Sequence, residues 1–229
     1  MGIINDFIAS LEANAPSKGA NWVKVDFHLH TPESYDQKYA NCGYDLIAKT
    51  VAEQGFRIVV VTDHNTLAGY EALRTAAAAY GMLVLPGAEF SVKTLAVEDQ
   101  SQRLGNRHIH LLAIFDPELP DLEFALKTIL SGGDATASVL TVPAKDAAIE
   151  GRYVEQLIEQ LHKMGALVIP AHLHSNHRDP ANSRSIDDVF TDEVFLKWVR
   201  TGLFDALEVL NLSSLTLFEP DGWPSAQIA

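Results

Sequence analysis

The stretch RIVVVTDHN, residues 57–65, is a short apolar run that ends in acidic and imidazole side chains. Similar apolar runs occupy residues 22–27, 82–90, 108–115, 166–170 and 205–210. Most of the stretches around them have helical spacing, and helices are expected at 3–13, 43–54, 67–80, 121–130, 152–164 and 187–201. Short apolar runs that alternate with helices are typical of a parallel sheet buried on both faces. The sequence therefore predicts an α/β fold with six strands.

Polar side chains gather at or just past the ends of these runs. They are His28, His30, Asp63, His64, Glu89, His172 and the stretch from Glu208 to Asn211. An α/β barrel collects its chemistry at the carboxyl ends of its parallel strands. This placement favours a barrel over an open doubly wound sheet, which the number of strands also allows. We expect a lead-in over residues 1–21, one barrel domain over 22–211 and a tail over 212–229.

Composition is that of an ordinary globular chain, with 229 residues, 47% hydrophobic and 21% charged. The net charge of −13 argues against a surface that holds nucleic acid through many phosphate contacts. It does not exclude a nucleic-acid substrate, because bound divalent metals would reverse the sign inside a cleft. We expect no membrane span, since no apolar run approaches about 20 residues. The single cysteine, Cys42, and the lack of a signal-peptide pattern indicate a cytoplasmic location.

The segment DFHLH, residues 26–30, carries a pair of histidines two positions apart. Side chains two apart on a strand point to the same side, so His28 and His30 can share one metal ion. The same spacing also occurs on ordinary surface strands. Glu89 follows the third run, where a carboxylate can bridge two cations or form a structural salt bridge.

Asp63 and His64 close the second run. Asp63 can orient a metal-bound histidine, or it can cap the helix that follows. A second histidine pair, His108 and His110, opens the fourth run, and its two members cannot be distinguished by spacing. His172 follows the fifth run. The repeated occurrence of such residues at strand ends predicts a multi-metal site, and the mixture of imidazole and carboxylate suits zinc, manganese or iron better than calcium or magnesium.

Several of these segments together resemble the PHP family, the polymerase and histidinol phosphatase domains. They are HLHTPES (28–34), TDHNT (62–66), PGAEFS (86–91), the HLLAIF stretch led by His110, PAHL (170–173) and ALEVLN (206–211). The matching motifs run in order from residue 24 to about 211. The first two are fairly specific in combination, and the later ones are weaker singly.

The resemblance implies a metal-dependent phosphoesterase built on a distorted (βα)7-type barrel, similar to a TIM barrel, with up to three metal ions. By motif, the ligands would be His28, His30, Asp36, His64, Glu89, His110 and His172. Of these, Asp36 stands where many relatives have a histidine. The residues expected to carry catalysis are His28, His30, Asp63, His64 and Glu89.

One feature of the family is absent from the sequence. PHP domains usually end in a strand with an Asp-x-His pair, and none follows residue 211. We therefore expect the barrel to lack its last strand and the chain to be the N-terminal part of a longer protein. An ATPase-like C-terminal region is a hypothesis that follows from the resemblance.

The expected reaction is hydrolysis of a phosphate ester by a metal-activated water. The substrate would be a phosphomonoester or phosphodiester, in a phosphorylated small molecule, a nucleotide or a nucleic acid. Arg178 can hold a phosphate by a two-pronged contact, or it can be a surface arginine. One alternative is an amidohydrolase-like enzyme, which would want a lysine after a middle strand, and no predicted strand ends in one. The other is a non-catalytic metal-binding domain of a larger ATPase or polymerase.

Overall fold

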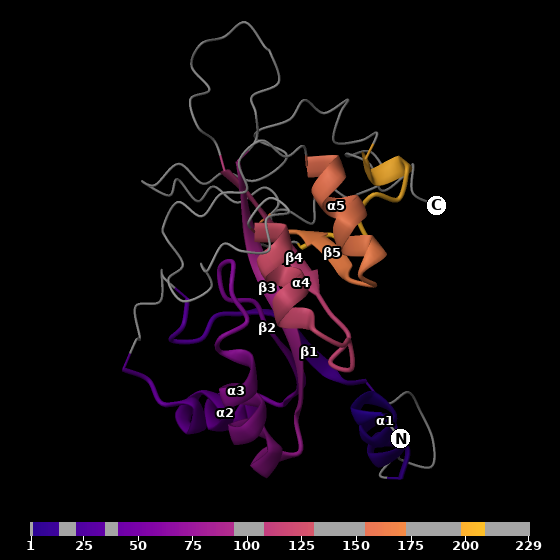
Figure 1. The fold of residues 1–229 in the computed structure, drawn as a ribbon. Helices are drawn as coiled ribbons and strands as arrows, with labels where there is room; N and C mark the ends of the chain where they lie inside the picture. Colours follow the sequence, from indigo (N-terminus) through magenta and orange to yellow (C-terminus); the bar gives the residue numbers. More distant parts are fainter. Residues whose placement is uncertain are drawn as a thin grey trace, which may run out of the picture.

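The computed structural model describes residues 2–13, 22–34, 41–93, 108–130, 154–172 and 198–208 (Figure 1). Several predictions lie outside these residues and stay predictions. They concern Asp36, Arg178, Asn211, the tail 212–229 and most of the helix expected at 187–201.

Five strands form one curled sheet, which is half of a barrel and confirms the α/β, barrel-like fold. They are β1 (Lys24–Leu29), β2 (Phe56–Val61), β3 (Leu83–Lys93), β4 (His108–Ile114) and β5 (Leu167–Pro170), in that order across the sheet. Each lies where an apolar run predicts it. However, β3 continues past residue 90 and ends at Lys93, so the expectation that no strand ends in a lysine is wrong.

The sheet is mixed, not parallel throughout. β1, β2 and β3 are parallel, but β4 runs antiparallel to both β3 and β5. The sequence between β3 and β4 lacks helical spacing, and an antiparallel neighbour needs no helical crossover. As a result, the start of β4 lies at the same end of the sheet as the carboxyl ends of β1, β2, β3 and β5.

Helices α2 (Tyr44–Glu53), α3 (Tyr70–Ala77), α4 (Leu122–Leu130) and α5 (Val154–Lys163) flank the outer side of the curled sheet, with the short 3-10 helix η1 (Ala78–Tyr80) after α3. Helix α1 (Ile3–Ala13) lies apart from the sheet, below β1 in Figure 1, and buries no residue. One core cluster joins α2 and α3 to β2 and β3 through residues such as Val59, Val61 and Leu73. A larger one joins α4 and α5 to β3, β4 and β5. None of the helices in the described ranges has the length and apolar character that crossing a membrane requires.

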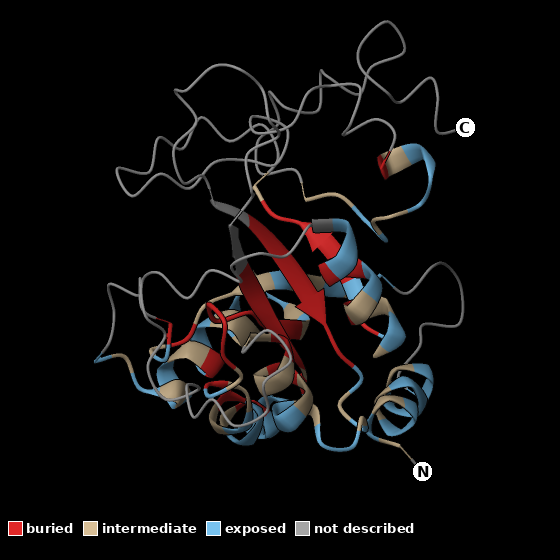
Figure 2. Cartoon of the chain, turned by 45° about the horizontal axis from the view of Figure 1, so that its top comes forward, coloured by how far each residue is buried: buried red, intermediate tan, exposed pale blue. Residues whose placement is uncertain are grey.

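The two faces of the sheet follow the alternation of its strands. On β3 and β4, Phe90 and Leu111 point outward into the larger cluster, whereas Leu112 and Ile114 point inward. The inward residues form a third apolar cluster with Val60 and Ile169. β2, β3, β4 and β5 are largely buried, β1 is only partly buried, and the helices expose their outer sides (Figure 2). The concave side of the half-barrel therefore has an apolar floor.

The sixth predicted strand, 205–210, is not formed over residues 205–208, and residues 209 and 210 lie outside the described part. This segment nevertheless runs beside β5. The Asp205 N–H donates to the Val168 carbonyl at 3.0 Å, and the Asp205 carboxylate accepts the Val168 N–H at 2.7 Å. Its side chains can therefore reach the open side of the half-barrel, between β5 and β1.

The packing of helices on the outer side of the sheet predicts that two phenylalanines contribute differently to stability. Phe90 is fully buried on β3, and Phe124 is 58% exposed on α4. Phe90→Ala should lower the free energy of unfolding by about 3–5 kcal/mol, because it leaves a cavity. Phe124→Ala should change it by no more than about 0.5 kcal/mol. Urea unfolding measures both, and equal losses would show that β3 is not packed under α4 and α5.

Candidate metal centre

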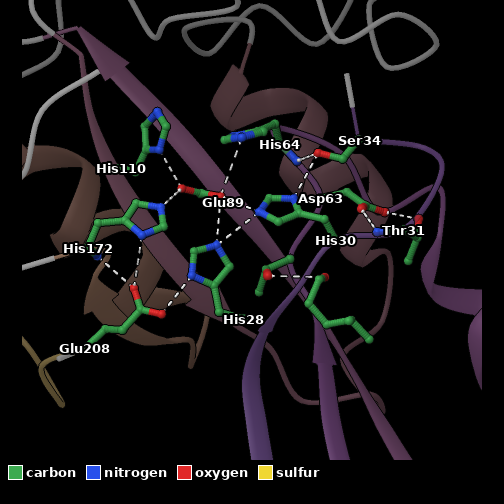
Figure 3. Close-up of polar contacts among 12 residues, drawn as sticks. His28, His30, Thr31, Ser34, Asp63, His64, Glu89, His110, His172 and Glu208 are labelled. Atoms are coloured by element: carbon green, nitrogen blue, oxygen red, sulfur yellow. Dashed lines mark hydrogen bonds and ion pairs between the residues drawn. The ribbon is translucent and has the colours of Figure 1, made fainter. Parts of the chain in front are cut away.

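The centre of the site is the carboxylate of Glu89 on β3, which has no solvent exposure. Its oxygen Oε2 lies 2.9 Å from Nε2 of His28 and 3.0 Å from Nε2 of His30. Oε1 lies 2.5 Å from Nδ1 of His110 and 3.2 Å from Nε2 of His172. A fifth ring, that of His64, places Nε2 at 3.6 Å from Oε2. Figure 3 shows these rings arranged around the carboxylate.

The five rings come from four segments of the chain, at β1, β2, β4 and β5. His28 lies on β1 and His30 directly after it, and the two side chains point to the same side. His64 follows β2 and forms a bridge with Glu89 that extends the parallel pairing. His172 follows β5. His110 is near the start of β4 and reaches the site only because β4 is antiparallel to its neighbours.

Electrostatics in this cluster are dominated by the buried carboxylate. Burial by itself would raise the pKa of Glu89, but the charge and hydrogen bond of His110, with hydrogen bonds from His172 and His28, hold it well below its ordinary value. Burial would likewise lower the pKa of His28, and here the hydrogen bonds and charges of Glu208 and Glu89 raise it to about 10. Without metal, the carboxylate is ionised and His28 keeps its proton at neutral pH.

The donor atoms fit a divalent metal ion. Nε2 of His28 and Nε2 of His30 are 3.1 Å apart, and each is within 3.0 Å of Oε2 of Glu89. A tetrahedral ion with bonds of about 2.0–2.1 Å separates its ligand atoms by about 3.3 Å, which is close to this spacing. Among the described residues, three groups of side chains could hold an ion, and they are His28–His30–Glu89, His64–Glu89–His110 and His28–His172–Glu208.

Ser34 fixes the orientation of His30. The hydroxyl of Ser34 lies 2.9 Å from Nδ1 of His30 and accepts the His64 backbone N–H at 3.3 Å. A partner on Nδ1 leaves Nε2 of His30 directed at Glu89, which is how outer residues usually orient metal-binding imidazoles.

Asp63 contacts the chain beside the site. It is fully buried, and its two oxygens accept the backbone N–H of Thr31 at 2.6 Å and the hydroxyl of Thr31 at 2.7 Å. Burial raises the pKa of Asp63, and these two bonds partly oppose that shift. A Cβ atom at Gly69 would overlap both Thr31 and Asp63, so glycine is needed for this close approach. Asp63 thus holds the residue that directly follows His30.

The structure brings together six of the predicted ligands, His28, His30, His64, Glu89, His110 and His172 (Figure 3). Asp63 lies behind them, and Asp36 and Arg178 lie outside the described residues. Thr31, Ser34 and the role of Glu208 were not predicted. Thr31 and Ser34 lie inside the HLHTPES motif, and Glu208 lies in ALEVLN, so position within these motifs was the available signal.

Comparison with known proteins gives a family match and several similar folds, of which two are described below. Residues 26–126 match the model of the PHP domain. A search among curated protein sequences finds no match. A suggested metal-dependent phosphoesterase from Bifidobacterium adolescentis has a similar structure, with a TM-score of 0.52, 17% identity and coverage of 82% of this chain and 77% of the other. An amidohydrolase from Chromobacterium violaceum, solved with bound sulfate and no metal, has a TM-score of 0.53, 16% identity and coverage of 86% and 81%. At such identities the two likenesses establish the fold alone.

The Thr31–Asp63 contact predicts a difference between two substitutions. Thr31→Val keeps the shape but removes the hydroxyl that donates to a buried carboxylate, and it should lower the free energy of unfolding by about 1.5–3 kcal/mol. Thr31→Ser keeps the hydroxyl and should cost less. Urea unfolding of the two variants tests this, and equal losses would show that the hydroxyl bond to Asp63 is unimportant.

The raised pKa of His28 predicts that metal binding releases a proton. Because the pKa of His28 is raised, the metal-free chain at neutral pH holds a proton on His28 that the metal must displace, so apparent metal affinity should increase as pH rises from 6 to 9. Calorimetric zinc titrations in buffers of different ionisation enthalpy count the protons released. His162→Ala is the control, because His162 lies on α5 and contacts Asp205 and not the site. An affinity independent of pH would contradict the prediction.

Proposed function

We propose, from the match of residues 26–126 to the PHP domain, that this chain is a metal-dependent hydrolase that cleaves phosphate esters. The observation that carries the proposal is a fully buried glutamate, Glu89, contacted by five imidazoles on the concave side of a half-barrel. The family match, the fold and the His/Glu groups support a metal-dependent hydrolase. The phosphate ester as substrate is the finer part of the proposal.

The residues would divide into two ligand sets that share Glu89. His28 and His30 would hold one ion with Oε2, and His110 would hold a second with Oε1. His64 could join Glu89 and His110 in this second set, and His172 lies 3.2 Å from Oε1. A third ion, which the family resemblance allows, would need ligands beyond these, such as Asp36. Mixed nitrogen and oxygen ligands suit zinc, manganese or iron.

When bound, the ions would acidify an attacking water and neutralise charge on the phosphate oxygens. The chain contributes the geometry for this. Ser34 and Asp63 hold the segment around His30, and Glu89 fixes the spacing of the two ligand sets. The apolar floor beneath the site, which includes Leu112 and Ile169, lowers the local dielectric and strengthens these interactions.

Charge explains why an anionic substrate would require the metals. The chain has a net charge of −13, and the site itself contains Glu89 and Glu208. Divalent ions would reverse the local sign and attract a phosphate. We keep Arg178 as a phosphate-binding residue, an ATPase-like region in the intact protein and a cytoplasmic location as parts of the same proposal.

The substrate, and not a lysine at the end of a strand, distinguishes the proposed function from the amidohydrolase alternative. Lys93 ends β3, so a strand-end lysine does not distinguish the two classes here. A phosphate-ester hydrolase should act on bis-p-nitrophenyl phosphate or p-nitrophenyl phosphate and leave amides and lactones intact. The opposite preference would favour the amidohydrolase class.

The experiment that tests the proposal pairs metal content by mass spectrometry with turnover of the two nitrophenyl esters in added manganese or zinc. Glu89→Gln removes the charge that both ligand sets share, so it should lower both bound metal and turnover by at least about 100-fold, more than loss of an outer partner would. His162→Ala should change neither quantity. Metal binding without ester cleavage would contradict the phosphoesterase function and favour a non-catalytic metal-binding domain.

A further inference from the structure

Glu208 lies between β1 and β5, the two outermost strands of the half-barrel. Its oxygen Oε1 is 2.8 Å from Nδ1 of His28 on β1, and Oε2 accepts the backbone N–H of His172, after β5, at 2.7 Å. The side chain is only 16% exposed. Figure 3 shows it below His172 and to the left of His28, on the side of His28 away from His30. One carboxylate thus joins two segments that each supply an imidazole to Glu89.

The two nitrogens of His28 face different partners. Nε2 faces Glu89 at 2.9 Å and His30 at 3.1 Å, and Nδ1 faces Glu208. A neutral imidazole has one lone pair and one N–H. If Nε2 binds a metal together with His30 and Glu89, the proton of His28 must be on Nδ1, where Glu208 accepts it.

This constraint decides between two of the candidate metal groups. The groups His28–His30–Glu89 and His28–His172–Glu208 both include His28. Both could be occupied together only if His28 lost both ring protons and bound an ion through each nitrogen. Moreover, Oε2 of Glu208 already accepts the His172 N–H and lies 3.7 Å from Nδ1 of His172. In the second group, Glu208 is therefore better placed to orient His28 and His172 for the first group than to bind an ion of its own.

The backbone at His172 gives a second reason for this support. His172 has φ +58°, in the left-handed region that residues other than glycine adopt at a cost of about 1–3 kcal/mol. The bond from its N–H to Glu208 helps to hold this conformation, which directs the ring of His172 to Oε1 of Glu89.

We propose that Glu208 is a positioning residue of the metal centre and not a metal ligand. It fixes the tautomer and direction of the His28 ring and the backbone turn at His172. The inference rests on the proposed metal-dependent function, because it assumes that Nε2 of His28 is a ligand. Carboxylates that orient metal-binding histidines in this way typically contribute 10–100-fold to metal affinity.

The test uses the whole chain and zinc. In Glu208→Gln, the side-chain amide can accept only one of the two bonds, so zinc affinity should fall by about 10–100-fold while the number of bound ions stays the same. Loss of one ion, with the others bound as tightly as before, would overturn the proposal, because it would make Glu208 a ligand.

A spectroscopic measurement identifies the nitrogen used by His28. In zinc-loaded chain, the nitrogen-15 NMR shifts of His28 should show a protonated Nδ1 and a metal-bound Nε2. A metal-bound Nδ1 would contradict the proposal. Both readouts are independent of turnover, so a chain that binds zinc and cleaves no phosphate ester would refute the proposed function while these shifts still decide the role of Glu208.

Asp205→Ala is the matched control. Asp205 anchors the same segment to Val168 and contacts His162, but it touches none of the five rings around Glu89 in the described contacts. Its substitution should lower stability and leave zinc affinity and the His28 shifts close to those of the wild type. A loss of zinc affinity equal to that of Glu208→Gln would show that Glu208 acts only by anchoring the segment, and would overturn its positioning role.

Discussion

A fully buried carboxylate, that of Glu89, is the constraint on which the rest of the site depends. Removing an ionised carboxylate from water is costly unless cations or hydrogen-bond donors surround it. Here the compensation comes from imidazoles, and the pKa of Glu89 stays well below its ordinary value in spite of burial. The rings that supply it converge from segments spread between residues 28 and 172. Divalent ions would take over that compensation and share the same carboxylate.

The fold meets this requirement by separating the two faces of the sheet. Outward side chains such as Phe90 and Leu111 build the core under the helices. Inward side chains change along the strands from an apolar floor to the polar site, as from Leu112 to His110 on β4. The antiparallel direction of β4 is essential. In a parallel strand His110, near the start, would lie at the opposite end of the sheet from the site. Glu208 then connects the two edges, β1 and β5, at the level of the site.

Much of this arrangement could be predicted from the sequence. The apolar runs locate all five strands. The signal is most continuous where the strand is largely buried, as in β2, and weaker in the partly exposed β1. The histidines and Glu89 stand out because polar residues at the ends of such runs need a partner. The direction of β4 could not be predicted from its own residues, because a strand has the same periodicity in either direction. Only the missing helical spacing before His108 indicated it.

Contacts between distant parts of the chain also could not be predicted from the sequence. The sequence allows Asp63 to be a partner for an imidazole or a helix cap, whereas the structure pairs it with Thr31, because the loop after β1 packs closely over Gly69. Glu208 was recognised at the end of a predicted strand, but its partner His28 is 180 residues away. Pairings of this kind depend on how the sheet curls, and local patterns contain no information about that curvature.

The most direct test of the central claim is a crystal structure of the zinc-loaded chain, with the ions located by anomalous diffraction at the zinc edge. We predict two ions, each about 2.0–2.2 Å from a different oxygen of Glu89. One should also contact His28 and His30, and the other should contact His110. A single ion, or ions that do not touch Glu89, would contradict the claim that this buried carboxylate organises the metal centre.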